Sequence, residues 1–281
     1  MLQDPKVIGF IPTYNSEKFI SKTLEALAVQ TYSNLELWIC DDASTDNTAS
    51  VCRDFCKTDK RFKFYQNEKN LGWWKTSVYQ WQKAAKESDY CFFQPHDDVP
   101  FAEFVAAQVD LLQRYPNASL CVPGMKNNYA DGRMNSTILQ NLGTSDCAGL
   151  RIKPLVTWEV EGWWAAYHGL QRSRFIPSIL PIDYLRFGEK EFALDLIWLI
   201  KMAALGPFVC SDQVLFEKFY TVKTLSVQWK YNFKNRSAVY LAMAEAVFGM
   251  RIPSQDKWMI WKEILKKSWK SLLMKIPYRN K

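Results

Sequence analysis

The sequence has little of what zinc-binding and disulfide-rich proteins need. It contains only two histidines, and its seven cysteines form no pair of CxxC motifs and have no histidine cluster near them. These absences argue against a cysteine-based zinc site. Cys40, Cys91, Cys121 and Cys210 lie in apolar runs, and we expect them to be buried thiols. Because the cysteine count is odd and no signal peptide is recognised, we expect a reducing, cytoplasmic location.

Long hydrophobic runs and a broadly distributed excess of charge are also missing. No stretch approaches the roughly 18 uninterrupted apolar residues typical of a membrane span. The formal net charge is +7, and residues 251–281 hold nine basic and two acidic side chains. The remaining residues hold 27 side chains of each sign. Because the basic excess is confined to the tail, we do not expect nucleic-acid binding.

The basic tail is predicted to form an amphipathic helix over residues 255–276. Its apolar face consists of Trp258, Trp261, Leu265, Trp269, Leu272, Leu273 and Ile276. Its flanks and opposite face carry Lys257, Lys266, Lys267, Lys270 and Lys275. Such a helix fits a membrane surface of anionic lipid. It fits equally well a helix that docks its apolar face on the domain and turns its lysines to water.

Strand and helix patterns alternate along the first half of the chain. With 281 residues, 48% of them hydrophobic, the chain can form one large domain or two small ones. The expected strands cover residues 7–11, 35–40, 62–65, 90–94 and 119–122, and the expected helices cover 16–29, 46–56, 72–86 and 101–115. The alternation predicts an α/β fold, with a mostly parallel, doubly wound sheet and flanking helices. Ligands of such sheets bind beyond the carboxyl ends of the strands.

The alternation breaks over residues 125–165. Gly, Asn, Ser and Asp are frequent there, and Asp131-Gly132 is predicted to form a turn. Helical spacing returns over 191–205, and a short strand is expected over 208–210.

Two acidic pairs follow two of the expected strands. Asp41-Asp42 follows the strand at 35–40, and Asp97-Asp98 comes after the strand at 90–94. We expect both pairs at one edge of the sheet, where carboxylates can bind a hard cation that in turn holds a diphosphate. The alternative for Asp97-Asp98 is an acidic cap on the following helix.

Five segments together resemble glycosyltransferase family 2. They are GFIPTYNSEKFISKTLEALAVQTYSNLELWICDDASTDNT, NEKNLG, HDD, HGLQRSRF and FALDLIWLIKMAALGPF, in that order across residues 7–208. The first is specific as a unit, because it joins a strand, a Tyr-Asn turn, a helix and a second strand that ends in Asp-Asp. The resemblance implies a GT-A fold and inverting transfer from a nucleotide-sugar donor.

The resemblance also implies a division of the chain. Residues 1–230 would form the catalytic domain, with a nucleotide-sugar-binding half at 1–124 and an acceptor-binding half at 125–230. Residues 231–281 would form C-terminal basic amphipathic helices.

The resemblance places the nucleoside against the first motif. Tyr14 would stack on the base, Asp42 would accept a hydrogen bond from its imide, and Pro12 and Thr13 would shape the turn. Lys75 would reach the base or the phosphate. The alternatives are a packing role for Tyr14 at the strand end and a solvated helix lysine for Lys75.

The resemblance makes Asp98 the direct ligand of a Mn²⁺ or Mg²⁺ ion that neutralises the leaving diphosphate. Asp97 would contact the sugar or the ribose. Two positions depart from the family pattern, because Pro95 stands where a further Asp is common and Lys223 where a His is common. Lys223 could contact a phosphate as a point charge.

An inverting transfer needs a general base for the acceptor hydroxyl. The family carries an Asp 11 residues before a Gly that ends a helix, which matches Asp195 and Gly206. Asp195 is therefore the expected base, and a capping or salt-bridged Asp is the alternative. The family's Glu-Asp pair is here Leu194-Asp195, and Glu191 is the substitute candidate.

Three residues are candidates for the acceptor side. Trp163 and Trp164 would stack on an acceptor sugar, or else pack against the sheet edge. His168 would shuttle a proton, or else serve as a buried structural histidine.

These expectations describe an inverting glycosyltransferase of surface polysaccharide assembly, peripheral on the inner face of the cell membrane. Its donor would be a nucleotide-sugar, with a UDP-sugar favoured, and its acceptor a glycan or a lipid-linked hydroxyl. The missing acid and histidine motivate an alternative, a non-catalytic nucleotide-sugar-binding scaffold subunit. A sugar-1-phosphate nucleotidyltransferase is set aside, because Pro12-Thr13-Tyr14-Asn15 is not a glycine-rich basic phosphate loop.

Overall fold

The computed structural model describes residues 4–183, 193–220 and 232–273. Within them, nine strands form one sheet in the order β3-β2-β1-β4-β8-β6-β9-β5, with β7 paired to β6. The strands are β1 Val7–Thr13, β2 Leu35–Asp41, β3 Phe62–Gln66, β4 Tyr90–Phe93, β5 Val99–Pro100, β6 Leu120–Tyr129, β7 Met134–Thr137, β8 Gln171–Arg172 and β9 Phe208–Tyr220.

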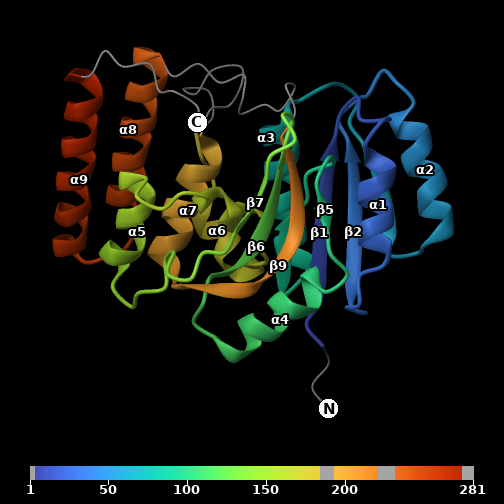
Figure 1. Ribbon diagram of the computed structural model, residues 1–281, viewed down its shortest axis with the longest axis horizontal. Coiled ribbons are helices and arrows are strands. Elements are labelled where there is room, and N and C mark those ends of the chain that lie inside the picture. The colour runs from blue at the N-terminus through green and yellow to red at the C-terminus, as the bar shows by residue number, and fades with distance from the viewer. Residues whose placement is uncertain (1–3, 184–192, 221–231, 274–281) are drawn as a thin grey trace.

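Helices flank this sheet and extend past one end of it (Figure 1). The α-helices are α1 Ile20–Ala28, α2 Thr48–Thr58, α3 Trp73–Glu87, α4 Phe104–Arg114, α5 Ala148–Thr157, α6 Ile176–Ile179, α7 Leu194–Leu205, α8 Phe233–Gly249 and α9 Ser254–Leu273. Two short 3₁₀ helices are η1 Trp163–His168 and η2 Ser173–Phe175. No helix among the described residues combines the length and the apolar character that crossing a membrane requires.

The first half of the sheet is parallel, as predicted. β1 lies between β2 and β4, and β3 pairs with β2, all in parallel. Thr13 is the register partner of Asp41, and the amide of Asp42 donates to the carbonyl of Thr13 at 2.8 Å. The carboxyl ends of β1 and β2 therefore lie level, and the loops that follow them meet at one edge.

The second half of the sheet is mixed and longer than predicted. Short antiparallel β8 joins β4 to β6, and β6 pairs in parallel with β9. The strand expected at 119–122 continues to Tyr129, and the strand expected at 208–210 continues to Tyr220. The added part of β6 is largely polar, and the added part of β9 starts with the polar residues Ser211-Asp212-Gln213 before Val214-Leu215-Phe216. Pairing between the two distant segments extends both strands across these polar residues.

The region predicted to be irregular, 125–165, contains regular structure. The turn at Asp131-Gly132 is confirmed, since it closes the hairpin of β6 and β7. Helix α5 was not predicted, because Gly149 and Pro154 interrupt its pattern. The chain then reaches η1 and Gly169, where an added Cβ would lie 1.8 Å from the carbonyl oxygen of Cys121. Only glycine allows this close approach of η1 to β6.

The C-terminal helices dock on the domain, and the docked face of α9 coincides only in part with the one predicted. Figure 1 shows α8 and α9 side by side, beyond α5 and α7. Ile260 and Ile264 of α9 are buried in the same apolar core as the sheet. Asp256 accepts from the amide of Gly149 at 3.2 Å. Trp261 of the predicted face packs against this core, whereas three other members of that face, Trp258, Leu265 and Trp269, are 57%, 46% and 66% exposed. The buried face was missed because only two isoleucines mark it.

Several predicted features lie outside the described residues. They include Glu191, Lys223, Lys275 and Ile276, together with the domain boundary at residue 230. The division of the chain into two halves and a tail therefore stays a prediction.

Candidate active site

Three segments with predicted site residues meet at the carboxyl edge of the parallel strands. The turn after β1 carries Tyr14, whose ring is 43% exposed. The loop after β2 carries Asp42, and the segment after β4 carries Asp97 and Asp98. His96 joins the first and third segments, because its Nδ1 lies 3.3 Å from the carbonyl of Pro12. The structure thus brings the two acidic pairs to one edge, as expected.

Asp42 is buried, and both of its carboxylate oxygens are already occupied. Its Oδ1 accepts from the side chains of Asn67 and Thr76 at 2.7 and 3.0 Å, and from the amide of Leu71 at 2.9 Å. Its Oδ2 accepts from the amide of Gly72 at 2.9 Å. These four bonds fix the loop that leads into α3. The predicted bond to a base imide stays a prediction, and it would have to share these oxygens.

The neighbouring features fit a nucleoside at this edge. Asp41 supports the loop after β2, accepting from the Ser44 amide at 3.2 Å and from the Gln66 side chain at 2.8 Å. A shallow open hollow lies beside them, lined by Ala43, Ser44, Gln66, Asn67 and Glu68. Lys75 is exposed in the first turn of α3. Tyr14 is exposed enough to meet a base, and its stacking role stays a prediction.

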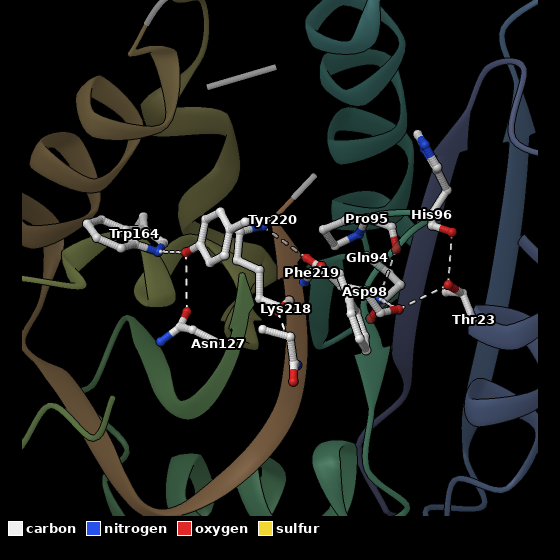
Figure 2. A network of polar contacts seen from close by, with 11 residues as sticks. Thr23, Gln94, Pro95, His96, Asp98, Asn127, Trp164, Lys218, Phe219 and Tyr220 are labelled. Atoms are coloured by element: carbon white, nitrogen blue, oxygen red, sulfur yellow. Dashed lines mark hydrogen bonds and ion pairs between the residues drawn. The ribbon is translucent and has the colours of Figure 1, made fainter. Parts of the chain in front are cut away.

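Asp98 is fully buried and bonded to β9 through both oxygens. Its Oδ2 accepts from the ammonium of Lys218 at 3.0 Å, and its Oδ1 accepts from the backbone amide of Phe219 at 3.0 Å (Figure 2). Gln94 and Thr23 donate to the Asp98 carbonyl, at 3.0 Å each. Sequence reasoning missed Lys218, because the strand that carries it was expected to end at residue 210. The local signal that could have found it is the apolar run Val214-Leu215-Phe216, which ends two residues before Lys218.

The described residues do not fit a divalent cation bound at Asp98. Both oxygens of Asp98 are occupied, one of them by a cation, and Pro95 offers no carboxylate. Asp97 is half-buried and makes no hydrogen bond or ion pair within the described ranges. No cluster of three or more His, Cys, Asp or Glu that could hold a metal occurs in the described parts of the chain. The role of Asp98 as a direct metal ligand stays a prediction, and its neighbours argue against it.

Asp195 lies in the first turn of α7, where its surroundings suit a base. Ala193 precedes the helix with φ 58°, and the Asp195 carboxylate accepts from the Leu196 amide at 2.9 Å. Burial raises the pKa of Asp195 to about 6, while this hydrogen bond and the charge of Lys218 act in the opposite direction. A carboxylate with such a pKa is ionised at neutral pH and still basic enough to accept a proton.

His168 is buried and neutral. Burial lowers its pKa well below the ordinary value, and the nearby charge of Lys218 lowers it further. Its Nδ1 has no hydrogen-bond partner among the described residues. The ring packs against Phe93 and Phe216, with centroids 6.2 and 5.3 Å away. This buried, ring-packed setting fits the structural alternative, and the proton-shuttle role of His168 stays a prediction.

Aromatic side chains gather along the outer half of β9. Trp164 donates through Nε1 to the hydroxyl of Tyr220 at 2.9 Å, and that hydroxyl donates to Asn127 at 3.2 Å (Figure 2). Tyr129 stacks on Tyr220, with centroids 5.0 Å apart and planes 10° from parallel. Trp163 meets Trp164 edge to face. The predicted tryptophans thus join two tyrosines that sequence reasoning missed.

The sequence comparison decides the family. The model of the family described as "Glycosyl transferase family 2" matches residues 10–175, more than half of the chain. This chain belongs to glycosyltransferase family 2. The putative glycosyltransferase EpsE of Bacillus subtilis (strain 168) is 30% identical over 203 residues, 68% of this chain and 70% of that protein. This family 2 chain spans only 10% to 32% of the length of seven other curated relatives.

Solved structures confirm the GT-A type of α/β fold. S. aureus TarS 1–349 in complex with UDP-GlcNAc superposes with a TM-score of 0.71 at 18% identity, covering 96% of this chain and 76% of that one. The mannosyltransferase PcManGT from Pyrobaculum calidifontis, in complex with GDP-Man and Mn²⁺, gives 0.59 at 13% identity, covering 98% and 77%. Identities this low establish the fold of the family 2 chain and leave its substrates open.

Proposed function

We propose that this protein is an inverting glycosyltransferase that moves a sugar from a nucleotide-diphosphate donor to a hydroxyl group. The observation that carries the proposal is Asp195, a half-buried carboxylate in the first turn of α7 that has one hydrogen bond and a raised pKa. As the acceptor oxygen bonds to the anomeric carbon, Asp195 takes its proton. The bond from that carbon to the diphosphate oxygen breaks, and the leaving group keeps the electron pair.

A UDP-sugar is the favoured donor. The exposed ring of Tyr14 and the hollow beside the loop after β2 offer a place for a base. The neighbour of known structure with a TM-score of 0.71 was solved with UDP-GlcNAc. Asp97, half-buried at the same edge, would contact the sugar or the ribose, and Lys75 the base or phosphate.

A glycan or a lipid-linked hydroxyl is the favoured acceptor. Tyr129, Tyr220 and Trp164 form an aromatic wall near His168, and aromatic faces suit sugar rings. On α9, Trp258, Leu265 and Trp269 are exposed beside the exposed Lys262 and Lys266. This surface suits an anionic membrane, as an enzyme of surface polysaccharide assembly would require. The seven cysteines are all free thiols, which suits the reducing cytoplasmic face of that membrane.

The function is tested with the full chain and a panel of UDP-, GDP- and dTDP-sugars. We expect one donor to raise the melting temperature and to be turned over, with inversion at the anomeric carbon seen by NMR. Asp195→Asn should lower kcat by about 10²–10⁴-fold while donor binding is kept. Leu194→Met, at the neighbouring buried position, serves as the control.

The scaffold subunit remains the competing function. Donor binding without turnover, with water or with any glycan or lipid-linked acceptor, would favour it over the enzyme. Turnover that is unchanged in Asp195→Asn would instead keep the enzyme and remove Asp195 as its base.

A further inference from the structure

Lys218 connects the donor side of the site to the acceptor side. Its ammonium is 3.0 Å from Asp98, and its side chain is 15% exposed. The next residue, Phe219, binds the same carboxylate through its amide. Two consecutive residues of β9 therefore hold the Asp98 carboxylate. These two hydrogen bonds place the ammonium of Lys218 at the carboxyl edge of the parallel strands, where the donor phosphates are expected.

The ammonium of Lys218 stays charged in this position. Its nitrogen lies 3.0 Å from the buried carboxylate of Asp98, and an ion pair of this geometry favours the charged form of both partners. The same positive charge reaches Asp195 and His168, since it acts on the pKa of both. Lys218 is thus a fixed cation that contacts Asp98 and whose charge also acts on Asp195 and His168.

Lys218 also keeps hydrogen-bonding capacity for a ligand. An ammonium has three N–H donors, and within the described residues Asp98 is its one hydrogen-bond acceptor. The ring of Tyr220 lies 5.5 Å from the nitrogen and shields one side. The remaining donors can meet phosphate oxygens, which lysine binds as a point charge.

A divalent cation would compete with Lys218 for the same carboxylate. Mg²⁺ binds carboxylate oxygens at about 2.0–2.1 Å. A Mg²⁺ ion on Oδ2 of Asp98 would therefore lie close to the ammonium of Lys218, which is 3.0 Å from the same oxygen. The two cations would repel each other, and displacing Lys218 would leave a mostly buried ammonium without its partner.

We infer that Lys218 is the fixed cation that faces the donor diphosphate in this protein, and that donor binding and transfer need no divalent metal ion. The inference rests on the proposed glycosyltransferase function and replaces the metal that the family resemblance implies. When the bond between the anomeric carbon and the diphosphate oxygen breaks, the electron pair stays on that oxygen. Lys218 donates hydrogen bonds to the developing charge and keeps its proton, while the acceptor proton goes to Asp195.

The first test uses the metal-free full chain. UDP binding is measured by calorimetry, and turnover of the donor found in the panel is measured in EDTA and in Mn²⁺. We expect EDTA to change the affinity for UDP and kcat by no more than about twofold. Loss of a charged contact to the diphosphate would change them by about tenfold or more. Loss of turnover in EDTA and its return with Mn²⁺ would overturn the inference but leave the glycosyltransferase function intact. Absence of turnover in both media would count against the proposed function instead.

The second test separates a role in the reaction from a structural ion pair. Lys218→Met should lower kcat by about 100-fold or more in EDTA. Because it frees the Asp98 carboxylate, it should also make the residual activity respond to Mn²⁺, which wild type does not do. Lys126→Met is the matched control, since it breaks the 2.6 Å ion pair of Lys126 with Glu217 on the adjacent strand. Equal effects of the two variants on kcat and melting temperature, with no Mn²⁺ response, would show that Lys218 is only structural.

Discussion

Two carboxylates at the candidate active site differ in how many hydrogen bonds stabilise their negative charge. Asp42 receives four hydrogen bonds from the loop that precedes α3 and from the first turns of that helix. Asp195 receives one hydrogen bond from a neighbouring amide and is otherwise desolvated. The first arrangement stabilises a loop, and the second suits the base that we propose. At the residue scale, this contrast separates a carboxylate whose charge the fold satisfies from one that keeps a raised pKa.

The raised pKa of Asp195 predicts how activity depends on pH. The base must be ionised, and a carboxyl group with a pKa of about 6 is protonated below that value. We therefore expect kcat to be level above about pH 7 and to fall about tenfold per pH unit below about pH 6. The measurement is kcat at saturating donor and acceptor from about pH 4.5 to 8, with the ionic strength held constant. A profile that stays level down to about pH 5 would contradict the assignment.

At the scale of elements, long strands complete the site. β9 was expected to end at residue 210, yet it continues to Tyr220 and delivers Lys218 and Tyr220. A run such as Glu217-Lys218 has no apolar pattern of its own, so its strand state comes from pairing with β6. The parallel strands β1 to β4 were predictable because each has an apolar core and a turn signal. β6, β9 and α5 were not fully predictable, because distant segments stabilise them.

Gly169 gives an element-scale prediction about the link between η1 and β6. Gly169→Ala places a methyl group 1.8 Å from a backbone oxygen, so the backbone must shift. We expect a loss of about 1–3 kcal/mol in the free energy of unfolding, measured by urea titration. Gly249→Ala at the end of α8 is the control, because its methyl group would meet no atom within 4 Å. It should be neutral or stabilising by up to about 1 kcal/mol. Equal stabilities of the two variants would refute the close approach.

Helix α9 offers a test with adjacent residues. Ile264 is 2% exposed and Leu265 is 46% exposed. Ile264→Ala should lower the free energy of unfolding by about 2–5 kcal/mol, because it leaves a cavity under the helix. Leu265→Ala should change it by about 0.5 kcal/mol or less. Calorimetric melting of both variants decides whether this face, and not the predicted tryptophan face, docks on the domain.

At the scale of the whole molecule, lysines of the basic tail and the exposed tryptophans lie on the same helix, α9. The docked face of α9 leaves Trp258, Leu265 and Trp269 exposed, with lysines between and beside them. The two alternatives for the tail are therefore compatible, since one face binds the domain and the other is free for a lipid surface. Figure 1 shows this pair of C-terminal helices at the end of the molecule opposite α1 and α2.

Vesicle binding provides the whole-molecule prediction. The protein should sediment with vesicles that contain phosphatidylglycerol, and binding should weaken as salt is raised. Replacing Trp258, Leu265 and Trp269 together by serine should reduce the partition coefficient by about tenfold or more. The melting temperature should be kept, because all three side chains are exposed. Wild-type protein that stays in the supernatant at low salt would contradict the membrane proposal.

The sequence by itself determined the family, the parallel half of the sheet and the edge where the acidic pairs meet. These features are local, since each strand, its turn and the acid after it lie within a few residues of one another. Only the tertiary structure decided what surrounds the acids. Lys218 and Asp98 are 120 residues apart in the chain, and the extended pairing of β9 brings them together. Likewise, the packing of α9 on the domain buries Ile260 and Ile264 and leaves Trp258 and Trp269 of the predicted face exposed. Residue patterns specify elements, whereas the partner of a buried charge is set by contacts between elements that no local pattern records.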